Sequence, residues 1–198
     1  MRRIGLLGGT FDPVHAGHVA MAYAALEEGI DHLIVMPCKL SPHKAFGSSE
    51  SKPAPDQHRW NMLQLAMPYD TRVELSVYEL DGPDYSFTWQ SLDYLKSIYP
   101  QDRIVLVIGE DQYDVLDTWA KFQEWRTWVE ILVFKREGMK SESLLKEEAI
   151  LATWSKIKIP TVSATDLRHR LAHGLEVKGL LPEGVAEYIE REGLYLKN

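Results

Sequence analysis

The amino-acid sequence predicts an α/β fold in which an open parallel sheet carries helices on both faces. Short apolar runs alternate with segments of helical periodicity, which is the rhythm of repeated strand-helix-strand units. The 198 residues are enough to bury a large core, and 45% of them are hydrophobic. We therefore expect one domain over residues 1–198, which ends in a C-terminal helical extension over residues 163–198.

Six apolar runs are predicted to form the strands of the sheet, at residues 3–7, 32–36, 72–77, 103–108, 130–134 and 156–159. Helical spacing is found between them, at residues 17–28, 56–67, 88–98 and 119–128, and in the tail at residues 163–171 and 182–191. In the first helix we expect a buried face made by Val19, Ala22, Tyr23 and Leu26. Each helix between two strands returns the chain parallel to the preceding strand, in a right-handed crossover.

The overall charge restricts the partners. The chain has 22 Lys and Arg against 29 Asp and Glu, a net charge of −7 that argues against general nucleic-acid binding and a polybasic membrane anchor. Cys38 is the only cysteine, so no intramolecular disulfide forms and a cytoplasmic location is favoured. The apolar run that follows Met1 breaks at Gly8, too early for a signal peptide or a membrane span. We expect neither nucleic acid nor a membrane as partner, and homo-oligomerisation stays open.

The turn after the first predicted strand has the sequence GGTFDPVHAGH over residues 8–18. In an open α/β sheet this turn lies at the carboxyl edge of the strands, where paired glycines let a phosphate approach the backbone. His15 and His18 are three residues apart, so a helix brings both imidazoles to one side, where they can donate hydrogen bonds to phosphate oxygens. Neither the Rossmann dinucleotide fingerprint nor the P-loop pattern is present.

Two other interpretations of the histidine pair are open at this point. His18 could cap the start of the helix and pack there without contacting a ligand. Alternatively, the pair could bind zinc with Asp12 as a third ligand, although no further His or Cys stands at a convincing spacing.

The same turn resembles the signature of the H-x-G-H nucleotidyltransferase superfamily and, within it, the bacterial nicotinate-nucleotide adenylyltransferases. Six further segments resemble that family's motifs in the same order. They are Pro37 with PHK at 42–44, QHRWNM at 57–62, Glu79 with SFT at 86–88 and SL at 91–92, GED at 109–111 with Leu116 and Trp119, Arg136, and VSATDLR at 162–168. Each short motif is weak alone, but seven in the correct order form a specific match. The resemblance implies a Rossmann-like fold.

The resemblance also implies a reaction. A phosphate oxygen of nicotinate mononucleotide attacks the α-phosphorus of ATP, which yields nicotinate adenine dinucleotide and pyrophosphate in NAD biosynthesis. In such in-line chemistry the protein positions the reactants and stabilises charge, and it need not supply a nucleophile. Mg²⁺ is expected to enter with ATP and screen the triphosphate, and we assign no metal ligand to the protein.

Site residues follow from the matching motif positions. The catalytic residues implied are His15, His18, Lys44 and Arg168. The residues implied to bind ATP are Gly8, Gly9, Thr10, Phe11, His15, His18, Asp111, Ser163, Thr165 and Arg168. Those implied to bind the mononucleotide are Lys44, Thr88, Trp119 and Arg136. We interpret His169 and Arg170 as part of a solvated helix face, and Trp125 and Trp128 as core residues.

Departures from the family pattern leave two alternatives open. Ser41 replaces the first of two usual prolines, Ala164 lacks the usual hydroxyl, and Asp81 lies near a position where many members carry a basic residue. The first alternative is a sister transferase that acts on nicotinamide mononucleotide or phosphopantetheine, or that uses a cytidylyl donor. The second is a non-catalytic nucleotide-sensing module, against which the two intact histidines argue.

Overall fold

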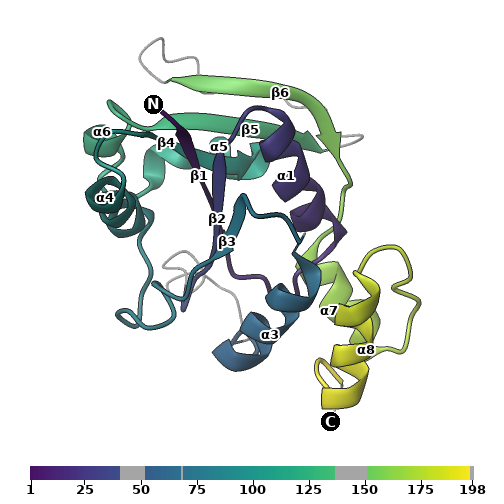
Figure 1. Ribbon diagram of the computed structural model, residues 1–198. Helices are drawn as coiled ribbons and strands as arrows, with labels where there is room; N and C mark the ends of the chain where they lie inside the picture. The colour runs from purple at the N-terminus through teal and green to yellow at the C-terminus, as the bar shows by residue number, and fades with distance from the viewer. Residues whose placement is uncertain (41–51, 68, 137–150, 197–198) are drawn as a thin grey trace.

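A six-stranded parallel sheet forms the centre of the protein (Figure 1). The computed structural model describes residues 1–40, 52–67, 69–136 and 151–196. The strand order is β3-β2-β1-β4-β5-β6. The bounds are β1 (Arg3–Gly9), β2 (His32–Pro37), β3 (Val73–Leu75), β4 (Arg103–Gly109), β5 (Glu130–Arg136) and β6 (Ala152–Ile159). The predicted α/β fold with an open parallel sheet is therefore confirmed, and the order is that of the doubly wound Rossmann fold.

The four inner strands form where the apolar runs predict them, because a parallel strand covered on both faces needs nearly continuous hydrophobic sequence. In the middle of the sheet, Leu6 of β1 pairs with Ile34 of β2 and with Leu106 of β4. Four strands begin at the predicted residue and end one or two residues later than predicted. The other two differ more: β3 covers only three residues of the run at 72–77, and β6 begins at Ala152, before the predicted run at 156–159.

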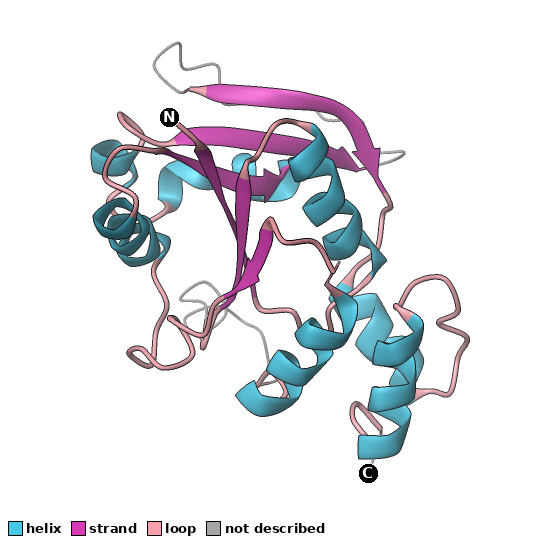
Figure 2. Ribbon diagram, viewed as in Figure 1, coloured by secondary structure: helices cyan, strands magenta, loops and turns pink. Residues whose placement is uncertain are grey.

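Helices connect the strands and lie on both sides of the sheet (Figure 2). They are α1 (Ala16–Glu27), α3 (Asp56–Ala66), α4 (Thr88–Ile98), α5 (Glu110–Tyr113), the 3-10 helix η1 (Leu116–Thr118), α6 (Phe122–Trp125), α7 (Ala164–Ala172) and α8 (Glu183–Glu192). The continuous helix predicted over residues 119–128 is wrong. Lys121 has a left-handed backbone conformation with φ 57°, and this separates Trp119 from the short helix α6.

Two hydrophobic clusters cover the two faces of the sheet. The cluster on one face includes side chains of α1, α3 and α8, with α8 packed against α3, and the cluster on the other face includes side chains of α4, α5 and α6. On α1 the buried stripe is centred on Met21, Ala22 and Ala25, whereas Tyr23, predicted to be buried, is 50% exposed. No helix in the described part of the chain is both long enough and apolar enough to cross a membrane. The single-domain assignment stays a prediction.

The direction of winding reverses between β1 and β4. After β1 the chain passes through α1 to β2 on one side, and after β4 it passes through α5 to β5 on the other. Pairing of β1 with β4 runs from Arg3 with Arg103 to Leu6 with Leu106, before the carboxyl ends of both strands at Gly9 and Gly109. Such a topological switch point leaves a crevice for ligands between the diverging loops.

Candidate active site

A cavity of about 900 Å³ opens at this switch point. Its volume is within the range usual for small-molecule sites. Among the sequence-predicted residues, those that line it are Gly8, Gly9, Thr10, Phe11, His15, His18, Thr88, Asp111, Trp119, Arg136 and Ser163. Thr165 and Arg168 do not line the cavity but lie in the first turns of α7, beside it. Lys44 is outside the described residues.

Glycines line part of the cavity, and the missing side chains of Gly8, Gly17 and Gly109 leave space there. A Cβ placed on Gly8 would meet no atom within 4 Å, so this residue faces open space where a ligand fits. A Cβ on Gly17 would lie 3.2 Å from the His15 ring and from the Pro160 carbonyl oxygen. A Cβ on Gly109 would lie 2.6 Å from an oxygen of Asp111. The glycines at 17 and 109 therefore allow the neighbouring His15 and Asp111 side chains to take their positions.

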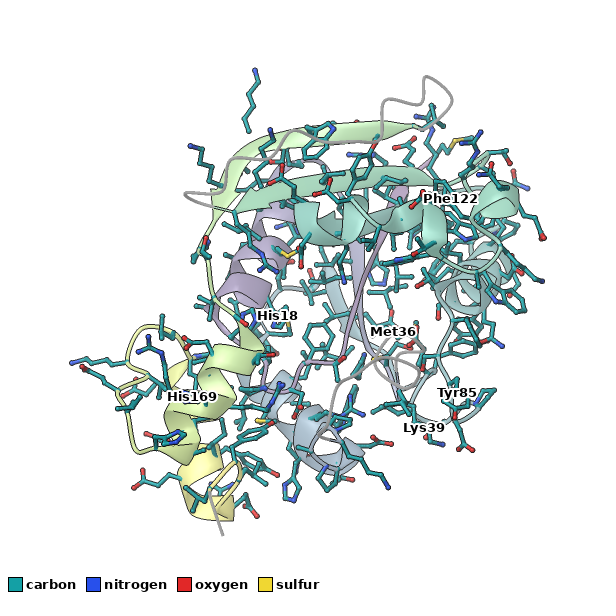
Figure 3. The ribbon with its side chains drawn as sticks, turned by 180° about the vertical axis from the view of Figure 1, so that it is seen from behind. His18, Met36, Lys39, Tyr85, Phe122 and His169 are labelled. Atoms are coloured by element: carbon teal, nitrogen blue, oxygen red, sulfur yellow. The ribbon has the colours of Figure 1, made fainter. Side chains whose placement is uncertain are left out.

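His15 and His18 stack on each other at the start of α1. Their ring centroids are 3.6 Å apart with an interplanar angle of 16°, and Phe11 packs edge-on against His18 at 4.8 Å. The His15 backbone N–H donates to Nδ1 of His18 at 3.3 Å, which leaves Nε2 as the protonated nitrogen of a neutral ring. The prediction that the two imidazoles share one side is therefore confirmed, and Figure 3 shows His18 at the end of α1 that approaches α7.

His15 is held in its neutral form. It is only 5% exposed, and its Nδ1 has no hydrogen-bond partner among the described residues. Burial, together with the positive charge of Arg136, lowers the pKa of His15 to about 4. The guanidinium of Arg136 is itself paired with Asp111 at 3.1 Å. At neutral pH His15 can therefore offer a hydrogen bond without bringing a charge of its own.

A fully buried arginine, Arg59 on α3, organises the backbone behind the glycine turn. Its guanidinium donates to the carboxylate of Asp56 and to four backbone carbonyl groups. The carbonyl acceptors are those of Thr10, Cys38, Lys39 and Ala54, at 2.6–3.2 Å. Arg59 thus ties the loop after β1 to the loop after β2. The motif at 57–62 drew attention to this residue, but its burial and its acceptors could not be predicted from the sequence.

Asp12 is not arranged as a metal ligand. One carboxylate oxygen accepts hydrogen bonds from the Tyr195 hydroxyl at 2.7 Å and from the Ala54 N–H at 3.0 Å. The other oxygen faces Arg168 at 3.5 Å. Within the described ranges, no group of three or more His, Cys, Asp or Glu side chains could hold a metal ion. The described residues therefore do not support the zinc interpretation.

The start of α7 places Arg168 beside the cavity, next to the lining residue Asp12. Ser163 caps this helix by accepting the N–H of Asp166 at 3.5 Å. Arg168 donates to the Asp12 carbonyl oxygen at 2.6 Å and to the Thr165 hydroxyl at 3.3 Å. His169 is exposed on the same helix, away from His18 (Figure 3). Its neighbour in the sequence, Arg170, pairs with Asp166 at 2.7 Å, so both belong to a solvated face as predicted.

The opposite wall of the cavity is formed by the segment before α4 and by Trp119. The Lys39 N–H, just after β2, donates to the Ser86 hydroxyl at 3.0 Å, which joins this segment to the end of the sheet. Lys39 and Tyr85 lie close together in Figure 3. Burial raises the pKa of Glu79, which lines the same wall and accepts a hydrogen bond from Ser91. Trp125 is a core residue, as predicted, and is 2% exposed.

Comparison with known proteins agrees with this arrangement. A family model described as cytidylyltransferase-like matches residues 6–170. The chain is 32% identical to a probable nicotinate-nucleotide adenylyltransferase of Clostridium botulinum, over 96% of this chain and 97% of that protein. It is also 32% identical to the enzyme of the same name from Lactiplantibacillus plantarum, over 100% of this chain and 90% of that protein. The chain belongs to the nicotinate-nucleotide adenylyltransferase family.

The fold of this adenylyltransferase chain also matches a solved structure. The nicotinic acid mononucleotide adenylyltransferase of Plasmodium falciparum superposes with a TM-score of 0.75 at 18% identity, covering 98% of each chain. At that identity the likeness shows the fold alone. Family motifs that are far apart in the sequence contribute lining residues to the cavity, at 8–18, 79–88, 109–119, 136 and 162–164. The motif at 57–62 does not line it, but Arg59 of that motif bonds the carbonyls of the lining residues Thr10 and Cys38.

Sequence reasoning missed several apolar residues of the cavity. They are Leu6, Leu7, Met21, Cys38, Leu106, Ile108, Val115, Ile159 and Val162. Residues of this kind carry no catalytic pattern, and those in strands and helices look the same as core residues. Their position at the carboxyl ends of adjacent strands, or beside them, is the one signal that could have pointed to them.

Proposed function

We propose that this protein transfers the AMP group of ATP to nicotinate mononucleotide, which forms nicotinate adenine dinucleotide and pyrophosphate in NAD biosynthesis. The observation that carries the proposal is the stacked pair His15 and His18 beside the open backbone of Gly8, at the switch point of the sheet. Two relatives that are 32% identical over nearly their whole length carry this enzyme name. The solved Plasmodium falciparum enzyme is complexed with NaAD, the product of the proposed reaction.

The phosphate side of the cavity supports the transfer step. A mononucleotide phosphate oxygen bonds to the α-phosphorus, and the bond to the bridging oxygen breaks as pyrophosphate leaves with its electron pair. Thr10, His15 and His18 are proposed to contact the α- and β-phosphates, as donors aimed where negative charge develops. Thr165 and Arg168 are proposed to hold the outer phosphates, together with Lys44 from the segment outside the described residues. Gly9, Phe11 and Ser163 are proposed to complete the ATP site.

The other wall of the cavity is proposed to seat the mononucleotide. Trp119 would stack on the pyridine ring, since an aromatic face packs well against a planar heterocycle. Thr88 and Arg136 would contact the mononucleotide, and Asp111 would accept hydrogen bonds from a nucleotide ribose. Arg136 and Asp111 are joined to each other by an ion pair at 3.1 Å.

We further propose that Mg²⁺ accompanies ATP. The described side chains offer no set of three metal ligands, which fits a cation held by phosphate oxygens and water, the arrangement that Mg²⁺ favours with nucleotides. Such a cation supplies charge neutralisation on the triphosphate. The predicted cytoplasmic location and the absence of nucleic-acid or membrane partners stay predictions.

Turnover with a panel of acceptors tests the function. The purified protein is incubated with ATP, Mg²⁺ and one acceptor at a time, and released pyrophosphate is measured. We expect the fastest release with nicotinate mononucleotide. No release with either pyridine mononucleotide would overturn the proposal. Release with phosphopantetheine instead would indicate a sister transferase, and ATP binding without any turnover would indicate a nucleotide-sensing module.

A further inference from the structure

The C-terminal tail reaches the phosphate side of the cavity through one tyrosine. After α8 the chain turns at Gly193, which has a φ of 63°, and the Leu194 N–H donates to the Ile189 carbonyl oxygen at 3.0 Å. This turn directs Tyr195 inward, where its ring packs against the core and its hydroxyl donates to Asp12 at 2.7 Å. Asp12 and Tyr195 are 183 residues apart in the sequence.

The Asp12 carboxylate has its two oxygens in different environments. One oxygen accepts two hydrogen bonds, from Tyr195 and from the Ala54 N–H. The second lies 3.5 Å from the Arg168 guanidinium, longer than the usual 2.7–2.9 Å of a direct charge-assisted hydrogen bond. Arg168 instead donates at 2.6 Å to the neutral backbone carbonyl of Asp12. The carboxylate is therefore kept from pairing fully with this arginine.

We propose that Tyr195 is a positioning residue for the ATP triphosphate, because its hydroxyl orients the Asp12 carboxylate and thereby keeps the Arg168 guanidinium available to phosphate. The proposal rests on the proposed function for the role of Arg168. Burial and the negative charge of Asp12 raise the pKa of Tyr195 far above its usual value, so the hydroxyl stays a hydrogen-bond donor. Without this donor, the 5% exposed carboxylate turns to Arg168 to replace the lost hydrogen bond.

Tyr188 on α8 provides a matched control. Its hydroxyl accepts from Asn61 at 2.8 Å and is paired with His58 at 2.8 Å, so it also attaches the tail to the rest of the protein. Both partners lie on α3, which runs beside α8 in Figure 1. Tyr188 is 5% exposed and does not line the cavity. Tyr188→Phe therefore removes a buried tail hydroxyl without changing the surroundings of Asp12.

The test compares Tyr195→Phe with Tyr188→Phe in the full-length protein. Binding of a non-hydrolysable ATP analogue with Mg²⁺ is measured by calorimetry, and KM is measured separately for ATP and for nicotinate mononucleotide. We expect Tyr195→Phe to weaken analogue binding and raise KM for ATP by about threefold to tenfold, the net effect of one ordinary hydrogen bond, because Tyr195 acts on ATP only through Asp12 and Arg168. The KM for the mononucleotide should stay unchanged, and Tyr188→Phe should change neither constant.

A double-mutant cycle with Arg168→Met shows whether the loss of analogue affinity in Tyr195→Phe depends on Arg168. We expect Tyr195→Phe to cause no further loss of analogue binding once Arg168 is replaced. An unchanged affinity in Tyr195→Phe would overturn the proposal, as would an equal loss in Tyr188→Phe or a full additional loss in the Arg168→Met background. If the wild-type protein binds the analogue but does not use nicotinate mononucleotide, the proposed function fails while the binding data still decide the role of Tyr195.

Discussion

The two sides of the cavity are built differently. On the phosphate side, the charged side chains Arg59 and Asp12 are 0% and 5% exposed, and several hydrogen bonds fix each of them. On the side proposed to seat the mononucleotide, the Arg136 side chain is 27% exposed, and one ion pair joins it to Asp111, a proposed ATP contact whose side chain is 44% exposed. Buried networks hold a single geometry, whereas exposed pairs contribute little and can rearrange. We therefore expect the proposed phosphate side to be preorganised and the proposed acceptor side to adapt to its substrate.

The largest expected effect comes from breaking the buried network. Arg59→Met removes the donors to four backbone carbonyls, so the free energy of unfolding should fall by about 3–5 kcal/mol. Chemical denaturation measures this change. As a control, Arg72→Met removes an exposed arginine that pairs with Asp70, and it should have little effect. Equal stability of the two variants would show that the phosphate side is not held by Arg59.

Removing one imidazole should have the next largest effect, on rate. His18→Ala should lower kcat by about 10²-fold, the cost of losing one donor that stabilises the transition state. Pyrophosphate release measures the rate, and thermal unfolding checks that the variant folds. His169→Ala, on the exposed face of α7, should keep wild-type turnover. Near-normal turnover in His18→Ala would remove this residue from the mechanism.

Stability should depend on pH through His15. Its pKa is about 4 in the folded protein, below the unperturbed value of 6.5, so between these values the unfolded chain binds more protons. The free energy of unfolding should therefore fall as the pH falls through this window, by about 2 kcal/mol at pH 5 from His15 alone. Denaturation at a series of pH values, compared with His15→Asn, isolates this contribution because the carboxylates are common to both proteins. Parallel curves would contradict the assignment.

A substitution on the side proposed to seat the mononucleotide should have the smallest effect on activity. Trp119→Ala should raise KM for the mononucleotide by about tenfold, equivalent to about 1.4 kcal/mol, while KM for ATP stays nearly constant. Trp125→Ala, in contrast, removes a tryptophan that is 2% exposed and should lower Tm without changing either KM in the folded protein. If Trp119→Ala raised both KM values equally, the division of the cavity into two sides would be wrong.

The sequence predicted the features that depend on local pattern. Apolar runs located the four inner strands closely, because a strand between two helix layers must be apolar along its length. The edge strands β3 and β6 contain charged and exposed residues, so their bounds were predicted less well. The glycine and histidine turn was located because its residues are contiguous. The helix at 119–128 was wrong, since hydrophobic spacing does not reveal that Lys121 takes a left-handed conformation.

Contacts between distant segments could not be predicted. Tyr195 lies in a tail with no motif, and its contact with Asp12 depends on how α8 packs against α3. Arg59 stood inside a recognised motif, but the sequence alone does not show that its side chain is buried or that it bonds carbonyls from two loops. In both cases the deciding interaction joins residues whose proximity arises only after the sheet and helices have assembled.

Gly8 is a glycine that the fold itself does not require. A methyl group at this position would meet no protein atom within 4 Å, so neither packing nor backbone conformation calls for glycine. The space it leaves is part of the cavity floor. We therefore expect the missing side chain to make room for a ligand, so that Gly8→Ala gives a folded protein with an obstructed site, a reference for any measurement of substrate binding.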